Sequence, residues 1–343
     1  MWLNFNFLFI KTKPCNYAFI TAVKRTKRRL MWEQQSQIST SKSIFIMLLR
    51  KNIPFNYIFK KVRKELLFVT VIGLVIYYLT SAFSNVIPEM PLGIPAFLGT
   101  AISVILSFKL NQSYDRWWEA RKIWGSIVND SRTFVLQLQS FLSGSCSEDI
   151  RKLTFRHIAW CYSLNRFLRD LDPLPTLAHY MEPEEIEKIG SHRNRHLAIL
   201  QLNTNHLLRL RETGKLNIFS QIQINNTMVN FSNFMGMAER IKTTVFPATY
   251  RYFLHLTIYL FLVTLSISLR DIESYFEIPL LLVISAAFFL LEKTASHLEN
   301  PFSNLPTDTA MDAICNTIEI NLKQLINEKN VPAPLTSETF YIL

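Results

Sequence analysis

The sequence lacks the short motifs by which many nucleotide-binding and zinc-binding proteins are recognised. It contains no G-x-x-x-x-G-K and no G-x-G-x-x-G segment, so no glycine-rich loop is present to cradle the phosphates of a nucleotide. Its cysteines are scattered without a C-x-x-C pair, which indicates neither a zinc site nor a disulfide framework. We therefore expect no metal or other cofactor, and we interpret the cysteines as reduced core residues. They are Cys15, Cys146, Cys161 and Cys315.

Two further function classes find little support. Histidines and carboxylates are dispersed, no catalytic arrangement can be recognised, and we expect the protein not to be an enzyme. The formal net charge of +11 suits a nucleic-acid partner, but residues 1–46 hold eight Lys/Arg against Glu33 alone, so only +4 belongs to the rest of the chain. The basic cluster at 24–29 fits anionic headgroups or the marking of topology, and no nucleic-acid partner is expected.

Residues 1–46 differ in pattern from the rest of the chain. Their apolar part precedes their charges and no small-residue cleavage site is visible, which is the reverse of a secretory signal. Because Met31 and Met47 both precede better-patterned sequence, we expect a disordered basic extension or an overlong start. The intact mass of the natively expressed protein would distinguish the two. We place one domain at 47–330 and a C-terminal tail at 331–343.

Apolar residues make up 49% of the chain, more than a soluble protein of 343 residues usually has. Four apolar segments stand out, and the first is uncharged for more than the ~20 residues needed to cross a bilayer. The fourth is short for a full span. The alternative, buried helices of a large soluble protein, applies more to the second pair than to the first. The expected spans are about 66–87, 93–110, 252–269 and 276–291.

Flanking charges predict the orientation of these spans. Lys60, Lys61, Arg63 and Lys64 precede the first span, which places its N-terminal side in the cytoplasm. The middle section shows apolar residues at three- and four-residue spacing and no alternating strand pattern. We predict an all-α membrane protein with four transmembrane helices, a helical cytosolic domain at about 111–242 and 300–328, and both termini on the cytoplasmic side of the cell membrane.

Thr100, Val104 and Phe108 recur at intervals of four in the second span, which places them on one helical face. On spacing alone, such an uncharged stripe most often packs against neighbouring helices. If several copies surround an axis, the same residues form stacked rings that gate a pore by dewetting. In the third span, His255 is a candidate for a hydrogen bond between helices, or less readily for a proton-linked role.

Two segments carry a family resemblance. YDRWWEARKIWG comes after the second span, and ENPFSNLPTDTAMDAICNTIEINL lies at 299–322. In order and spacing they resemble the bestrophin family, specifically its bacterial and chloroplast branch, over about residues 47–327. The motif residues are Tyr114, Asp115, Arg116, Trp117, Trp118, Glu119 and Arg121 in the first segment, and Asn300, Pro301 and Phe302 in the second.

The resemblance implies a homopentameric ion channel whose second helices line a neck closed by three hydrophobic rings. Counting back from Arg116 places these rings at Thr100, Val104 and Phe108. Thr100 departs from a position that is generally apolar, so we expect a wider, wetter outer ring and a leakier channel. The tryptophan pair would end the pore helix at the membrane surface, with the arginines reaching headgroups or nearby carboxylates.

The resemblance also implies a second, cytosolic constriction after a Gly-Lys-Leu turn. GKLNIF at 214–219 matches that turn and points to Phe219, or to Ile218 if the register slips; a core aromatic under a turn is equally compatible with the spacing alone. Animal members hold calcium with an acidic run after Asn-Pro-Phe. This chain offers only Asp308 and Asp312 there, so we do not expect calcium regulation.

The sequence therefore predicts a homo-oligomer, by resemblance a pentamer, that passes small monovalent inorganic ions through a lipid bilayer. Chloride and other anions are favoured by the resemblance. A sodium or potassium channel of the same architecture is one alternative. A membrane-anchored regulatory or binding protein, with the helical middle as its working part, is another.

Overall fold

Helices account for all the regular secondary structure of residues 55–83, 90–270 and 274–336, which the computed structural model describes. No strand occurs in these ranges, and the all-α prediction is confirmed. The expectations for residues 1–46 and for the end of the tail concern residues outside the described ranges.

Among the described residues, four helices are long and apolar enough to cross a membrane. They are α2 (Phe55–Ala82), α3 (Gly93–Phe141), α9 (Ala248–Ser268) and α10 (Ser274–Leu298). Helix α10 is longer than its apolar run, which removes the concern that the fourth segment is too short. Helices α3 and α10 extend beyond the expected spans, and α2 and α9 begin earlier than expected, because hydrogen bonding along a helix continues into charged residues, whereas hydropathy marks only the apolar portion. Helix α2 ends at Ala82, before the expected end of the first span at 87.

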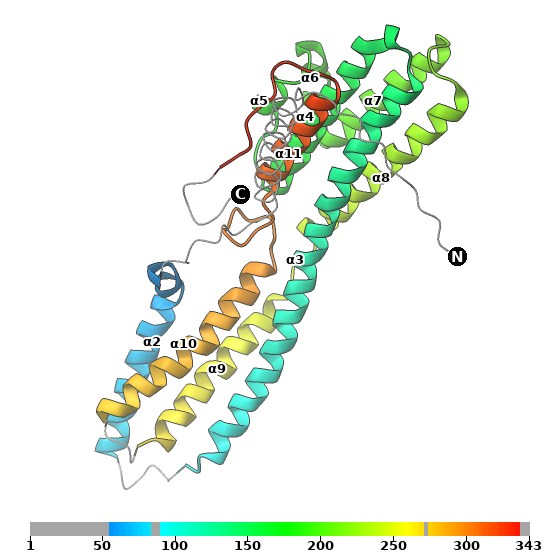
Figure 1. The fold of residues 1–343 in the computed structure, drawn as a ribbon. Coiled ribbons are helices and arrows are strands. Elements are labelled where there is room, and N and C mark those ends of the chain that lie inside the picture. Colours follow the sequence, from blue (N-terminus) through cyan, green and yellow to red (C-terminus); the bar gives the residue numbers. More distant parts are fainter. Residues whose placement is uncertain (1–54, 84–89, 271–273, 337–343) are drawn as a thin grey trace, which may run out of the picture. The chain divides into compact units, whose positions relative to one another are not determined.

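These four helices pack together around a shared apolar core. Helix α10 contacts α2, α3 and α9, and α9 contacts α2 and α3 (Figure 1). Ile102, Leu106 and Phe289 lie in this core. Large apolar side chains on the outer faces, such as Leu67 and Val283, are exposed, as expected of residues that meet lipid or another subunit.

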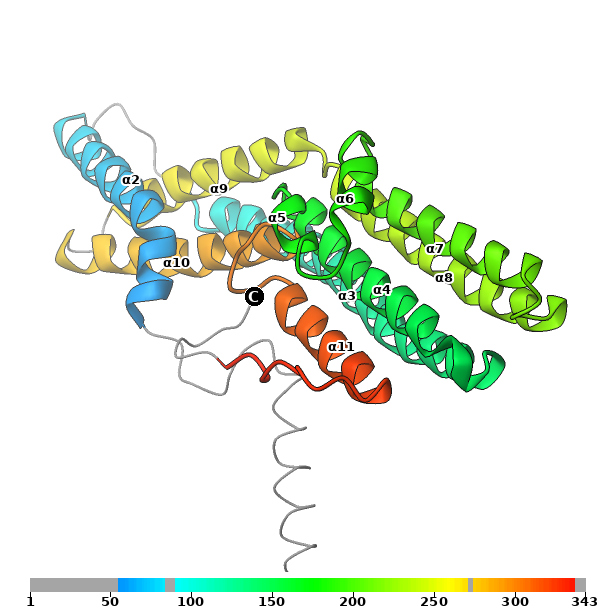
Figure 2. The same ribbon diagram turned by 90° about the horizontal axis from the view of Figure 1, so that it is seen from above.

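The remaining helices form a second bundle along the continuation of α3. Figures 1 and 2 show α3 running from the first bundle into the second, where it contacts α4, α8 and α11. The elements are η1 (Gly144–Cys146), α4 (Ser147–Leu168), α5 (Leu174–Leu177), α6 (Pro183–Gly190), α7 (Arg195–Glu212), α8 (Ile218–Thr243) and α11 (Met311–Leu325).

Aromatic side chains fill the centre of the second bundle. The ring of His157 lies 4.3 Å from that of Phe231 and 5.4 Å from that of Trp160, and its Nε2 is 2.8 Å from the hydroxyl of Ser131. Burial lowers the pKa of His157 to about 3, so this histidine is a neutral packing residue. Cys146, Cys161 and Cys315 are buried, and Cys161 and Cys315 are free thiols, in agreement with their interpretation as core residues.

Candidate functional site

The first half of α3 carries an exposed stripe that includes the three residues singled out from the sequence. Thr100 is exposed, and Val104 and Phe108 expose 51% and 62% of their surface. The opposite face is buried and contains Ile102 and Leu106. A stripe that packed against another helix of this chain would be buried, so the common explanation for such a pattern does not hold within one subunit.

The hydroxyl groups on this face are turned back onto the helix. Thr100 Oγ1 donates to the carbonyl oxygen of Ala96 at 2.9 Å, and Ser103 Oγ donates to that of Gly99 at 2.8 Å. Their protons are therefore engaged, while the oxygen lone pairs stay available to water. The exposed stripe combines apolar surface with weakly polar oxygen atoms and carries no charge up to Phe108.

Beyond Phe108 the exposed face of α3 becomes polar. Asn111 and Asp115 are exposed one and two turns further on, and Trp118 lies beyond them with its indole partly exposed. The rings of Tyr114 and Trp118 are nearly parallel, with centroids 6.5 Å apart. Contrary to the expectation from the sequence, the helix does not end at the tryptophans but continues unbroken to Phe141, because α8 and α11 pack against its C-terminal half.

Arg116 points toward the end of α8. Its Nη2 donates to the carbonyl oxygens of Ile241 and Thr244, both at 2.5 Å. Helix α8 ends at Thr243, so these oxygens belong to the last turn, where carbonyls lack partners inside the helix and the helix dipole favours a cation. Arg116 therefore caps α8, and its guanidinium also interacts electrostatically with the carboxylates of Glu299 and Glu119.

The other residues of the first motif make separate contacts. Trp117 Nε1 donates to the carbonyl oxygen of Thr307 at 2.9 Å, and so holds the segment that contains the Asn-Pro-Phe motif. Glu119 accepts from Arg240 at 2.9 Å, another tie to α8. Arg121 is half-buried. The motif thus joins α3 to two segments of the second bundle.

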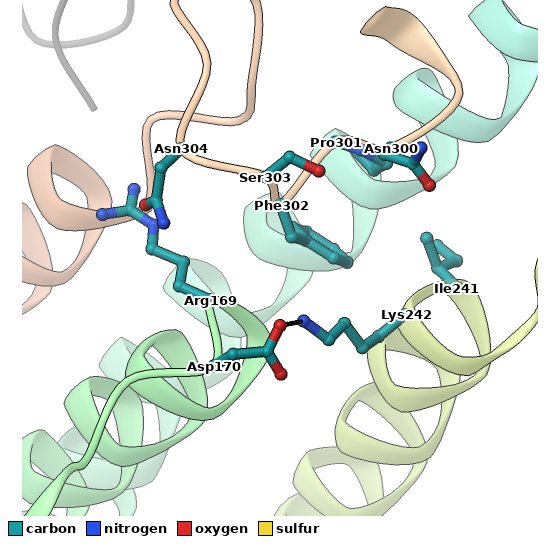
Figure 3. A pocket seen from close by; sticks show the side chains of 9 residues that line it. All are labelled: Arg169, Asp170, Ile241, Lys242, Asn300, Pro301, Phe302, Ser303 and Asn304. Carbon is teal, nitrogen blue, oxygen red and sulfur yellow. Dashed lines mark hydrogen bonds and ion pairs between the residues drawn. The ribbon is translucent and has the colours of Figure 1, made fainter. Parts of the chain in front are cut away.

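The Asn-Pro-Phe segment forms one wall of a cavity of about 300 Å³ (Figure 3). Phe302 and Pro301 are buried, whereas Asn300 is exposed. On the opposite wall Lys242 pairs with Asp170 and donates to the carbonyl oxygen of Leu168 at 2.8 Å. The lining residues are Arg169, Asp170, Ile241, Lys242, Asn300, Pro301, Phe302, Ser303 and Asn304.

Asp308 binds the backbone of the segment that follows the Asn-Pro-Phe motif. Its Oδ2 accepts the backbone N–H of Leu305 at 3.1 Å, and its side chain is buried. Burial raises the pKa of Asp308 to about 6, and hydrogen bonds from backbone N–H groups oppose this shift. Asp312 accepts from Arg169 at 2.6 Å and from Asn165 at 2.7 Å. Within the described ranges, no group of three or more His, Cys, Asp or Glu side chains is placed to hold a metal ion.

The second predicted constriction lies at the start of α8. Gly214 adopts a φ of 74° in the preceding turn, and the side chain of Asn217 caps the helix by accepting the Ser220 N–H at 2.8 Å. This cap leaves Ile218 and Phe219 in the first turn, 55% and 78% exposed. Phe219 is therefore not a core aromatic of its own subunit, and both residues stay available to a constriction.

Sequence reasoning missed a buried charged cluster between the membrane-length helices. Lys109 Nζ lies 3.0 Å from Glu292 Oε1, and the two side chains are 0% and 1% exposed. His255 Nε2 is 3.3 Å from the other carboxylate oxygen of Glu292, an ion-pair distance without hydrogen-bond geometry. The signal was present, because both charges adjoin apolar runs. Hydropathy marks such charges as the ends of spans, whereas the helices continue past them.

Comparisons with known proteins agree with this arrangement. A model of a family described as "Bacterial/Fungal Bestrophin protein" matches residues 37–324. The Voltage-dependent anion channel-forming protein YneE of Escherichia coli (strain K12) is 30% identical over 287 residues, which cover 83% of this chain and 93% of the relative. The corresponding protein RSc3414 of Ralstonia nicotianae is 27% identical over 248 residues, 72% of this chain and 81% of the relative.

Solved structures show the same fold. The crystal structure of a bacterial bestrophin homologue from Klebsiella pneumoniae superimposes with a TM-score of 0.74 at 28% sequence identity, and the match covers 78% of this chain and 100% of the other. A variant of that homologue with the mutation L177T gives the same values. The family match spans most of the chain, and the motif residues that carried the resemblance lie within it. The chain therefore belongs to the bacterial/fungal bestrophin family.

Proposed function

We propose that this multi-pass membrane protein is a passive channel for small monovalent inorganic anions, built as a homopentamer whose α3 helices line the pore. The observation that carries the proposal is the exposed, uncharged stripe of Thr100, Val104 and Phe108 on a membrane-length helix. The relatives named as anion channel-forming proteins support the proposal of an anion channel. Five subunits are the stoichiometry that the resemblance to bestrophins implies.

The chemistry of the stripe suits a gate rather than a binding site. Rings of Val104 and Phe108 offer an ion no strong ligand. An ion therefore crosses only if the pore is wide enough for the ion to keep its water, and a small change in the pore radius fills the neck with water or empties it. The edge of the Phe108 ring carries partial positive charge and can face a passing anion. Thr100 is expected to keep the outer ring wetter than an apolar residue would.

The cytosolic side supplies the wider part of the pathway. We assign the second bundle to the cytoplasm, together with both termini, because the basic residues Lys60, Lys61, Arg63 and Lys64 precede the apolar run of α2. Phe219 or Ile218 would form the second constriction at the start of α8. We propose that the channel works without calcium, because the oxygen ligands that calcium would need are already engaged: backbone N–H groups donate to the carboxylate of Asp308, and Arg169 and Asn165 donate to that of Asp312.

A cation channel of the same architecture is the second candidate. Asp115 stands exposed on the stripe two turns beyond Phe108, and a ring of carboxylates at that level would attract cations. The uncharged neck itself does not favour either sign. The selectivity therefore depends on the summed charge of the vestibules of the assembled channel.

The deciding experiment is the reversal potential of the purified protein in a planar bilayer under a potassium chloride gradient. A shift toward the chloride equilibrium potential is expected. A shift toward the potassium value would contradict the anion assignment and leave the architecture intact. Absence of current from a verified pentamer would contradict the channel proposal and favour a membrane-anchored binding protein. A monomeric or dimeric mass in mild detergent would contradict the pentamer.

A further inference from the structure

The buried cluster behind the pore-side face links three membrane-length helices. Lys109 of α3 donates to Glu292 of α10 at 3.0 Å and to Ser296 Oγ at 3.1 Å, and Ser296 donates to the same carboxylate oxygen at 2.9 Å. The other oxygen of Glu292 faces His255 of α9 at 3.3 Å. The ammonium and the carboxylate are thus held at fixed angles by several partners.

Such a cluster is a costly way to hold helices together. Removing two charges from water carries a large penalty, and replacing a buried ion pair by apolar residues is often neutral or stabilising. Inside a membrane the penalty is greater, and charged residues there usually serve a function. A contribution to stability is therefore a weak explanation for the presence of this ion pair. Its hydrogen bonds, unlike apolar contacts, have a preferred direction.

Direction matters because of where Lys109 sits on α3. Adjacent residues of an α-helix point about 100° apart, so Lys109 directs its charge into the bundle while Phe108 projects from the exposed face. The apolar contacts of Ile102 and Leu106 oppose a large rotation of the helix, because it would expose both side chains, but they have no preferred direction and would tolerate a small one. The ion pair would not, because a turn of α3 would pull the ammonium off Glu292 and leave both charges buried and unpaired.

Arg116 and Trp117 also tie α3 to the second bundle about two turns further on, but these contacts lie outside the four-helix bundle that contains the pair of Lys109 and Glu292. A second tie at the level of Lys109 does not replace the constraint that this pair imposes. Tyr250 of α9 donates its hydroxyl to the carbonyl oxygen of Ile105 at 2.9 Å. A backbone carbonyl recurs at every residue of α3, so a rotated helix could offer Tyr250 another acceptor. The side chain of Lys109 has no such substitute on its helix.

We propose that Lys109 and Glu292 are positioning residues for conduction: their buried, directional pairing fixes the rotation of α3 and thereby aims Phe108 at the ion pathway. The proposal rests on the proposed channel function. It assigns no contact between either residue and the permeating ion, since both side chains are buried.

The test compares two paired substitutions. K109L/E292L removes the directional hydrogen bonds between the two side chains and replaces them with an apolar contact. K109Q/E292Q removes both charges and keeps the capacity for a hydrogen bond. We expect both variants to assemble, and only the leucine pair to shift the reversal potential toward zero. A cysteine at position 108, in a background with Cys15 replaced by serine, should react severalfold more slowly with a water-soluble maleimide in the leucine pair than in the parent.

A matched control is offered by Lys293, which follows Glu292 on α10. Lys293 Nζ is 2.8 Å from Glu65 Oε1 of α2, and this pair is partly exposed and does not involve α3. The variant E65L/K293L should keep the parent reversal potential and the parent labelling rate at position 108. A change equal to that of the leucine pair at 109 and 292 would overturn the proposal, because any lost ion pair would then suffice.

The remaining outcomes are equally decisive. An assembled K109L/E292L variant with parent-like reversal potential and labelling would show that the pair has only a structural role. Should the leucine pair fail to assemble, K109M/E292M takes its place, because methionine keeps much of the length of both side chains and removes their directional hydrogen bonds. Slower labelling at position 108 would then support the positioning role, and parent-like labelling would overturn it. If the parent carries no current, the proposed function fails, and the labelling rate still tests the rotation of α3.

Discussion

The indole nitrogen of Trp117 donates a hydrogen bond to the carbonyl oxygen of Thr307, 2.9 Å away, and so joins two motifs that lie far apart in the sequence. The neighbouring Arg116 binds the last turn of α8. The end of α8 and the segment that contains the Asn-Pro-Phe motif therefore meet at one turn of α3. A displacement of either segment would be transmitted directly to the helix that carries the proposed neck residues.

The cap formed by Arg116 predicts a loss of stability when it is removed. R116A would leave the Ile241 and Thr244 carbonyl oxygens without this donor, at a cost of about 2 kcal/mol for hydrogen bonds to a charged group. Thermal unfolding of the detergent-purified protein would measure the loss. K122A, which removes an exposed cation from the same helix, is the control. Equal melting temperatures for R116A and the parent would contradict the capping role.

Thr100 is polar at a position that the resemblance gives as generally apolar, and it predicts an outer ring through which ions pass more easily. T100I should lower the single-channel conductance, because an isoleucine ring is narrower and offers no oxygen to water. T70I is a matched control: Thr70 also lies on a membrane-length helix, and its hydroxyl also donates to the carbonyl oxygen four residues earlier, at 2.9 Å. An unchanged conductance in T100I would remove Thr100 from the pore neck.

The exposure of the side chains at the start of α8 predicts which residue forms the proposed cytosolic constriction. Phe219 is the more exposed of the two candidates, so we expect F219A to raise the conductance or alter ion selectivity more than I218A does. I222A removes another exposed apolar side chain one turn further on and is the control. A larger effect of I218A would shift the register by one residue. If neither variant changed the current, no constriction would lie at this turn.

Asp308 predicts a pH dependence of stability. Its pKa in the folded protein is raised to about 6, above the ordinary value of about 3.9. The folded state therefore holds its proton more tightly than the unfolded state, and the stability that this provides is lost as the pH rises from about 4 to about 6. The change is on the order of 3 kcal/mol.

The substitution D308N isolates this effect. Some other carboxylates behave in the opposite way: burial acts to raise the pKa of Glu185, but Arg156 and Lys152 lower it on balance. D308N and the parent share these groups, so their effects cancel in the comparison. The difference in melting temperature between D308N and the parent should therefore grow in favour of D308N between pH 4 and pH 6. A difference that is constant with pH would mean that Asp308 is not perturbed.

The Asn-Pro-Phe segment predicts that calcium is dispensable. Asp308 already accepts the Leu305 N–H, and Asp312 is engaged by Arg169 and Asn165, so these carboxylates are directed toward protein donors. Currents in a planar bilayer should be the same before and after addition of a calcium chelator. A current that disappears in chelator and returns with calcium would contradict this expectation.

Much of the fold could be predicted from the sequence. The four membrane-length helices follow from apolar runs such as that of α2, because the length of a span is set by the thickness of the bilayer. The stripe of Thr100, Val104 and Phe108 follows from the helical repeat, which fixes the angle between residues once a helix forms. Motif order and spacing are sufficient to identify the family.

The remaining features depend on tertiary structure. The sequence alone could not show that the stripe stays exposed, that Phe219 points outward, that Arg116 caps α8, or that Lys109 meets Glu292 across two helices. The physical reason is that local sequence determines the direction of a side chain relative to its own helix, whereas its partner is determined by how helices far apart in the chain pack together.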